Sequence, residues 1–130
     1  MTHKLILLFN HKVTELQAKD AYESLGVDRI EPLPPYLQNI WSNIPPEMSS
    51  IKDYLRPVEK WLSENAVSGD YVLIQGDFGA CHLMVNLALS QNLAPVYSTT
   101  ARIAQESILD DGHISLTHTF THVIFRKYGE

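Results

Sequence analysis

The feature that most constrains this chain is an apolar run that stops at two glycines and resumes with helical spacing. Residues Asp70–Gly79 read DYVLIQGDFG, and residues Ala80–Leu89 read ACHLMVNLAL. The first run is typical of a buried strand, and the spacing after the glycines is typical of a helix. We predict another parallel strand at residues 92–97, so that residues 70–98 form one right-handed βαβ unit.

The turn between this strand and helix contains Gly76 and Gly79. Glycine tolerates positive φ and lets another group approach the backbone closely. The helix that follows begins with unpaired N–H groups and the positive end of its dipole. We therefore expect this corner to suit an anion.

Composition restricts the class of protein. The chain has 130 residues, of which 45% are hydrophobic and 19% are charged, and these values are typical of one globular domain spanning residues 1–130. The net charge of −5 argues against a protein that coats long DNA or RNA, because such a surface needs a continuous basic stripe.

The sequence also indicates where in the cell the protein is expected. The longest apolar run, Leu5–Phe9, is too short to cross a membrane, and the first residues do not resemble a signal peptide. The one cysteine, Cys81, permits no internal disulfide and fits a reducing compartment. We expect a cytoplasmic protein with no membrane partner.

The first third of the chain predicts two strands and the helix between them. His3–Phe9 is almost continuously apolar, which is typical of a central strand covered on both faces. Thr14 and Gln17 form a capping-box pattern for a helix that Gly26 ends. Val27–Glu31 has mixed polarity and is predicted as an edge strand.

Residues 32–50 hold five prolines around one short apolar helix, Tyr36–Ser42. We favour a cap packed over the core for this segment, and a lid that contacts a ligand is the alternative. Apolar residues then recur at helical spacing from Ser50 to about Asn65. Pro57 should bend or split that helix.

The end of the chain predicts an antiparallel hairpin. Residues 101–109 and 114–128 flank an Asp-Gly turn signal, although a helix at 100–109 remains an alternative. The whole pattern predicts an α/β fold, a compact doubly wound and mainly parallel sheet with a C-terminal antiparallel hairpin. The strand at Tyr71–Ile74 should neighbour the first strand.

In such sheets ligands bind beyond the carboxyl ends of the strands, where the strand order reverses. Three polar loops should converge there and supply cations, an imidazole, hydroxyls and backbone donors, which suit phosphate. No P-loop or dinucleotide fingerprint is present. The candidate residues are Asn10, His11, Lys12, Gln75, Gly76, Asp77, Phe78, Gly79, Ser98, Thr99, Thr100 and Arg102.

Each charged or aromatic candidate also has a structural interpretation. His11 is a general base, a phosphate partner or an exposed loop histidine. Lys12 is a phosphate contact or a solvated charge, and Arg102 suits bidentate phosphate binding. Asp77 caps the helix or reads an adenine amino group. Phe78 stacks on a base or anchors the core.

Neither the cysteine nor the histidines near the end of the chain predict a cofactor. Cys81 lies within the predicted helix and is interpreted as a small buried hydrophobe. His113, His118 and His122 could suggest a metal site. If His118 and His122 lie on one strand, however, they are roughly 13 Å apart, too far to share an ion. We predict no metal site and no cofactor, and we assign no role to His82.

Several short motifs together resemble a known family. They are Leu7–Thr14 (LLFNHKVT), Trp41–Pro46 (WSNIPP), Gln75–Ala80 (QGDFGA), Pro95–Arg102 (PVYSTTAR) and Phe120–Arg126 (FTHVIFR). In order and spacing they resemble a small CRISPR-associated family of type III systems, the Csx proteins numbered twenty. The closing motif has Thr121 and Ile124 where charged residues are expected, so it carries no site role.

The resemblance implies a ring nuclease of cyclic oligoadenylate, built as a homodimer on a fold related to CARF, the CRISPR-associated Rossmann type. Four phosphates of cyclic tetra-adenylate would meet His11, Lys12 and Arg102 from each subunit. The proposed chemistry is metal-independent attack by the ribose 2′-OH. The competing hypothesis is a sponge that binds the ring without cleaving it, and a nucleotide-sensing module is a third.

Overall fold

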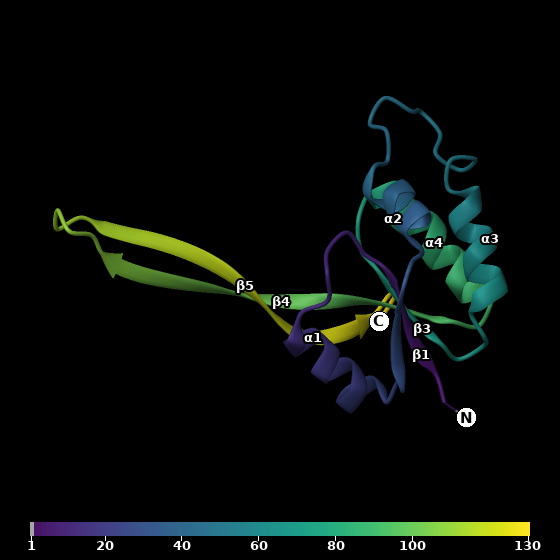
Figure 1. The fold of residues 1–130 in the computed structure, drawn as a ribbon, viewed down its shortest axis with the longest axis horizontal. Helices are drawn as coiled ribbons and strands as arrows, with labels where there is room; N and C mark the ends of the chain where they lie inside the picture. The colour runs from purple at the N-terminus through teal and green to yellow at the C-terminus, as the bar shows by residue number, and fades with distance from the viewer. Residues whose placement is uncertain (1) are drawn as a thin grey trace.

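The computed structural model describes residues 2–130 and contains one five-stranded sheet in the order β2-β1-β3-β4-β5 (Figure 1). The first four strands run parallel, and β5 pairs antiparallel with β4. The expected mixed α/β fold with a mainly parallel sheet and an antiparallel C-terminal strand is confirmed. The strands are β1 (Lys4–Leu8), β2 (Arg29–Pro32), β3 (Tyr71–Ile74), β4 (Ala94–Ile108) and β5 (Ile114–Lys127).

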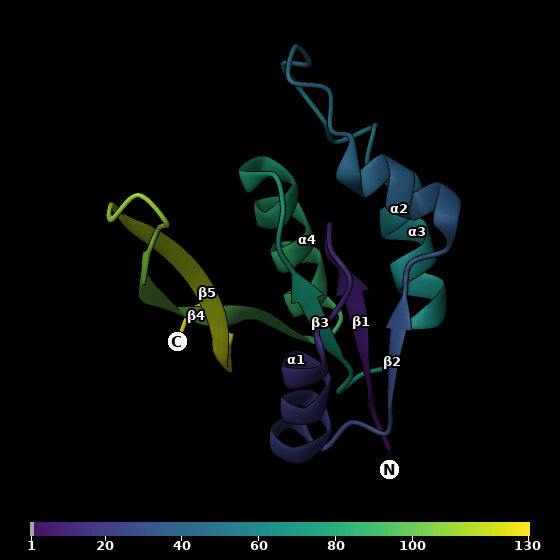
Figure 2. The same cartoon turned by 60° about the vertical axis from the view of Figure 1, so that its left-hand side comes forward.

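Helices cover both faces of the parallel part of the sheet. Helix α1 and a π-helical turn, η1, lie on one face, and the other three helices lie on the opposite face (Figures 1 and 2). Between Thr2 and Glu130 no helix is long and apolar enough to cross a membrane. The helices are α1 (Glu15–Asp20), η1 (Ala21–Leu25), α2 (Pro35–Ser42), α3 (Arg56–Asn65) and α4 (Phe78–Ser90).

Strand β1 divides the core into two layers, because its side chains alternate between the two faces of the sheet. Leu5 and Leu7 join the layer beneath α1, whereas Ile6 and Leu8 join the layer beneath α2, α3 and α4. The central position predicted from the continuous apolar run is confirmed, with β2 on one side of β1 and β3 on the other (Figure 2).

Local signals set the ends of α1 and η1 as expected. The Thr14 hydroxyl accepts a hydrogen bond from the Gln17 N–H at 3.1 Å, and the Gln17 side chain accepts one from the Thr14 N–H at 3.0 Å. Gly26 follows at φ 69°, the left-handed conformation that glycine adopts without strain. The capping box and the glycine stop are therefore confirmed.

The proline-rich segment follows the prediction more closely than the helix after it. Helix α2 buries Leu37 and Trp41 in the core, which confirms the packed cap. The helix predicted from Ser50 instead begins at Arg56, and that prediction was wrong. Pro57 lies in its first turn, where the missing N–H has no helical partner to lose, so the proline starts the helix rather than bending it.

Strands β4 and β5 extend together far beyond the sheet as a two-stranded arm (Figure 1). We call residues 100–122 of this hairpin the arm. The predicted antiparallel hairpin is confirmed, and the alternative helix at 100–109 was wrong. The strand expected at residues 92–97 does not end there but continues as β4 to Ile108, so residues 98–102 form strand rather than a loop.

The amino-terminal edge of the sheet is fixed by a buried carboxylate, Asp70, whose exposed fraction is 1%. Asp70 accepts hydrogen bonds from the Lys4 N–H at 3.1 Å and the Val67 N–H at 2.9 Å. The Lys4 ammonium lies 3.7 Å from the same carboxylate and donates to the Asn65 carbonyl at 2.6 Å. Asp70 thus joins β1 to the segment that enters β3.

We expect Asp70→Ala to lower the free energy of unfolding by about 3–5 kcal/mol, because it leaves two N–H groups without their acceptor and removes a carboxylate beside the buried Lys4 charge. Urea denaturation followed by circular dichroism measures the change. Asp28→Ala is the control, since this aspartate is exposed at the same edge of the sheet. Equal stability of the two variants would contradict the assignment.

Candidate functional site

Three connected hollows lie along the carboxyl ends of β1 and β3, where the strand order reverses. The α4 hollow, between α4 and β4, has a volume of about 520 Å³. The central hollow measures about 170 Å³, and the α2 hollow about 460 Å³. Gln75 and Gly76 line both the α4 and the central hollow, and Phe9, Asn10 and His11 line both the central and the α2 hollow. We call this continuous surface the rim.

The structure brings two of the three predicted loops together at the rim. Asn10 and His11, after β1, face Gln75 and Gly76, after β3, across the central hollow. His11 is exposed, with its ring edge-on to Phe9 at 5.5 Å between centroids, and Lys12 is an exposed residue of the α2 hollow. An imidazole and an ammonium are therefore open to a ligand at one end of the rim.

Gly76 makes room for an indole ring. The Trp41 side chain of α2 donates a hydrogen bond from Nε1 to the Gln75 carbonyl at 3.1 Å. A Cβ atom on Gly76 would lie only 3.1 Å from that nitrogen, so glycine permits the close approach. We expected a ligand to approach the backbone of this glycine closely, but in the structure the Trp41 ring does so.

The start of α4 is already occupied by a carboxylate. The Asp77 side chain accepts a hydrogen bond from the Ala80 N–H at 3.0 Å, which confirms its interpretation as a helix cap. This negative charge opposes a second anion at the same amide, and the expected anion site at the corner with Gly79 stays a prediction.

Phe78 stands at the first position of α4 and is 94% exposed. The interpretation as a core anchor was wrong. An exposed phenyl ring at the edge of the α4 hollow presents a flat apolar surface to anything that enters it. Base stacking therefore stays open as a prediction.

The α4 hollow has residues that the sequence did not single out. Tyr97 of β4 and Tyr128 after β5 form one wall, with ring centroids 4.8 Å apart. Arg126 donates a hydrogen bond to the Tyr97 hydroxyl at 2.9 Å and so places a cation beside this wall. His82 and Val85 of α4 line the hollow opposite. Only the strand register, which pairs Tyr97 with Arg126, could have identified this group.

Two titratable groups of the α4 hollow stay neutral. Burial raises the pKa of the Cys81 thiol, with a further contribution from nearby Asp77. Burial also raises the pKa of Tyr128 to about 12. The thiol is therefore not an activated nucleophile at neutral pH, in agreement with its interpretation as a small hydrophobe.

The third predicted loop does not join the others as a loop. Ser98 contacts a residue of the rim without lining a hollow, since its N–H donates to the Gln75 side-chain oxygen at 2.7 Å. Thr99 instead exchanges hydrogen bonds with the Ile124 backbone, and the exposed Thr100 pairs with His122 across the hairpin. These residues belong to the base of the arm.

Arg102 lies in the arm itself. It is four residues beyond Ser98, which corresponds to roughly 13 Å along a strand. Its guanidinium donates from Nε to His118 Nδ1 at 3.2 Å, and it lines none of the three hollows. The expectation that Arg102 follows a strand end and meets the glycine corner there was wrong, because β4 does not stop at Tyr97.

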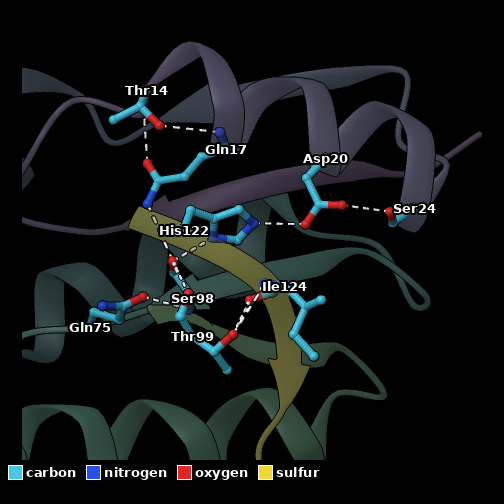
Figure 3. A network of polar contacts seen from close by, with 9 residues as sticks. All are labelled: Thr14, Gln17, Asp20, Ser24, Gln75, Ser98, Thr99, His122 and Ile124. Carbon is cyan, nitrogen blue, oxygen red and sulfur yellow. Dashed lines mark hydrogen bonds and ion pairs between the residues drawn. The ribbon is translucent and has the colours of Figure 1, made fainter. Parts of the chain in front are cut away.

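A buried polar network joins the base of the arm to α1 (Figure 3). The Ser98 hydroxyl lies 2.6 Å from His122 Nδ1, and His122 Nε2 lies 2.7 Å from an Asp20 carboxylate oxygen. Gln17 also contacts the Ser98 hydroxyl, at 3.4 Å. The order of groups is that of a serine-histidine-aspartate triad, but Ser98 lines none of the three hollows of the rim. The network therefore holds the arm to the body.

The Asp20 carboxylate is the charged end of this network. Partial burial raises its pKa, but hydrogen bonds with Ser24 and His122 and the charge of His122 outweigh that effect, so the pKa lies below its ordinary value of 3.8. The ionised form of Asp20 therefore stabilises the folded protein.

Comparison with known proteins places this arrangement in a family. A family model described as "Uncharacterized protein MJ1673 family" matches residues 3–126. A relative described as "Uncharacterized protein MJ1673", from Methanocaldococcus jannaschii, is 51% identical over 125 residues, which cover 96% of each chain. No solved structure matches the chain. The matched residues include the arm and all of the rim except Tyr128.

We expect Asp20→Asn to lower the free energy of unfolding by about 1–2 kcal/mol at pH 7. Because a lowered carboxyl pKa stabilises the folded state only above that pKa, the difference from the natural protein should shrink as the pH falls below about 4. Urea denaturation at pH 7 and pH 3 measures it, with the exposed Glu23→Gln on the same helical segment as control. A difference that is constant with pH would contradict the role of the charge.

Proposed function

This chain belongs to the uncharacterized protein MJ1673 family, and from the chemistry of its rim we propose that it binds and cleaves cyclic oligoadenylate, with cyclic tetra-adenylate as the preferred ring. The observation that carries the proposal is the continuous rim, which combines basic side chains, an exposed aromatic ring and hollows of nucleotide size. The motif resemblance to the Csx proteins numbered twenty points to the same ligand.

In this proposal the α4 hollow receives an adenine. Phe78 offers an exposed ring for stacking, and the Tyr97–Tyr128 wall offers an uncharged surface opposite α4. Aromatic stacking suits a nucleobase because every base has a flat π face. A volume of about 520 Å³ is in the range of small-molecule sites.

The phosphates would meet the basic side chains along the rim. His11 and Lys12 are exposed at one end, and Arg126 lies beside the α4 hollow at the other. Arg102 is not part of this set, because it lies in the arm. In a homodimer the three residues would occur twice and offer about six basic groups to the four phosphates of the ring.

The proposed cleavage needs no metal ion. The ribose 2′ oxygen attacks the adjacent phosphorus, and the bond from phosphorus to the 5′ oxygen breaks. The 2′-OH loses its proton, and the departing 5′ oxygen gains one. The product is a linear oligoadenylate with a 2′,3′-cyclic phosphate and a 5′-hydroxyl end. His11 is the proposed proton-transfer group, and Lys12 stabilises the extra negative charge on phosphorus.

The fold and setting complete the proposal. A sheet with its ligand at the carboxyl edge, where strand order reverses, suits the Rossmann-like CARF type. The protein would act in the cytoplasm, where it would lower the concentration of the second messenger of type III CRISPR systems. A sponge that only binds the ring is the second candidate, because attack by the 2′-OH of the ligand requires no protein nucleophile and the same rim would serve both functions.

Incubation with radiolabelled cyclic tetra-adenylate in EDTA tests the proposal. We expect many turnovers per protein molecule and products with 2′,3′-cyclic phosphate ends. His11→Ala should lower the turnover rate by about 100-fold while it weakens binding less than tenfold, because it removes proton transfer but little contact area.

The controls separate enzyme from sponge. Lys52→Ala removes an exposed lysine that lines none of the three hollows and should leave turnover unchanged. Retention of the ring without products would make the protein a sponge. No binding of the ring at micromolar concentration would overturn the proposal.

Phe78→Ala should weaken binding of cyclic tetra-adenylate by about 5- to 100-fold, because it removes the exposed ring on which a base would stack. Isothermal titration calorimetry measures the affinity. Tyr36→Ala, at an exposed aromatic residue of α2 outside the three hollows, is the matched control. Equal affinity of the two variants would place the base elsewhere.

A further inference from the structure

The arm has no partner within its own chain. In the described part of the protein, the hydrogen bonds of residues 101–121 are all made between β4 and β5 or within their turn. It nevertheless exposes large apolar side chains, with Ile108 82% and Phe120 69% exposed. A two-stranded hairpin alone is only marginally stable in water, so an arm of this length and composition calls for a partner.

The strand register shows which side chains share a face. Directly paired residues of antiparallel strands point to the same side of the hairpin. Successive pairs alternate between the two sides, so every second pair shares a face. One face of the arm carries most of the large exposed side chains, and the Arg102–His118 hydrogen bond lies on it. Its pairs, from base to tip, are Arg102–Phe120, Ala104–His118, Glu106–Leu116 and Ile108–Ile114.

The inner three pairs of this face form a pattern that is symmetric about its centre. On β4 the order is a cation, a small residue and an anion, Arg102, Ala104 and Glu106. On β5 the order is an apolar residue, a histidine and an apolar residue, Leu116, His118 and Phe120. Such a face is complementary to a copy of itself turned end to end.

We propose that the arms of two copies of this chain stack face to face about a two-fold axis that crosses the strands at the Ala104–His118 pair. Arg102 of each copy then lies over Glu106 of the other, and Phe120 lies over Leu116. Each of these two contacts occurs twice, whereas Ala104 and His118 lie at the axis and each face the same residue of the second copy. The small side chain of Ala104 lets the two arms approach closely at the axis.

The same arrangement gives the tip of the arm a place to rest. Ile108 and Ile114 lie as far beyond the axis as Thr100 and His122 lie before it, so they reach the base of the other arm. Beside His122 the body has a hollow of about 180 Å³, where the exposed apolar residues Leu16 and Val123 can meet the two isoleucines.

This inference goes beyond the proposed function, because an axis at the Ala104–His118 pair places the two bodies at opposite ends of the paired arms, and a dimer that offers both rims to one ring would need a second interface. It also removes a difficulty, because it gives Arg102 a partner although that residue does not reach the rim of its own chain. The dimer is tested without any nucleotide, so its failure and the failure of ring cleavage are separate results.

Charge exchange tests the arrangement. Sedimentation equilibrium of the full chain should show a dimer, and Arg102→Glu or Glu106→Arg alone should weaken it on the order of 100-fold, because like charges then face each other twice. The double variant should recover most of the affinity. Within one chain the two residues are roughly 13 Å apart on the same strand, so recovery reports contact between copies.

Cross-linking gives a second readout. In a Cys81→Ser background, Ala104→Cys should be joined to the second copy by a short bismaleimide, whereas Thr119→Cys, on the opposite face, should not. Circular dichroism establishes that each variant is folded. A monomer, a dimer indifferent to charge exchange, or equal cross-linking of the two cysteines would overturn the proposal, and capture of a different protein by the arm would do the same.

Discussion

Gln75 is the residue on which the geometry of the rim depends, because it is bonded to three separate segments. Its N–H donates to the Leu8 carbonyl at 3.0 Å, its carbonyl accepts from Trp41, and its side chain accepts from the Ser98 N–H. These bonds tie the end of β3 to β1, to α2 and to the point where β4 leaves the sheet. The hollows on either side of Gln75 exist because this one residue holds their walls at fixed positions.

The amino and carboxyl ends of the parallel strands have different roles. At the amino-terminal edge, Asp70 and Lys4 are buried and bonded, and they stabilise the sheet. At the carboxyl edge, His11, Lys12 and Phe78 are exposed, so they contribute little to the core and are free to contact a ligand. The aromatic ring, the ammonium group and the imidazole of the proposed site therefore lie on a surface that does not contribute to core packing.

Short-range signals in the sequence predicted much of the fold. The capping box at Thr14, the stop at Gly26 and the βαβ unit around β3 depend on residues that are close in sequence, and each is found in the structure. Pro57 was misinterpreted because a proline tolerated in a first turn and a proline that bends a helix give the same pattern of neighbours. Phe78 was ambiguous because its burial depends on whether another segment covers the start of α4.

The sequence by itself determined the periodicities, the caps, the order of strands and helices, and the residues that follow β1 and β3, because hydrophobic alternation and backbone capping act over a few residues. Only the tertiary structure decided that β4 continues past Tyr97, because that depends on pairing with β5 some 22 residues further along the chain at Thr100–His122. That pairing carried Arg102 away from the rim, brought Arg126 beside the α4 hollow and buried His122 against Asp20. The Asp-Gly signal predicted the hairpin, but how far its strands extend from the turn depends on their pairing in the folded chain, and no local pattern encodes that length.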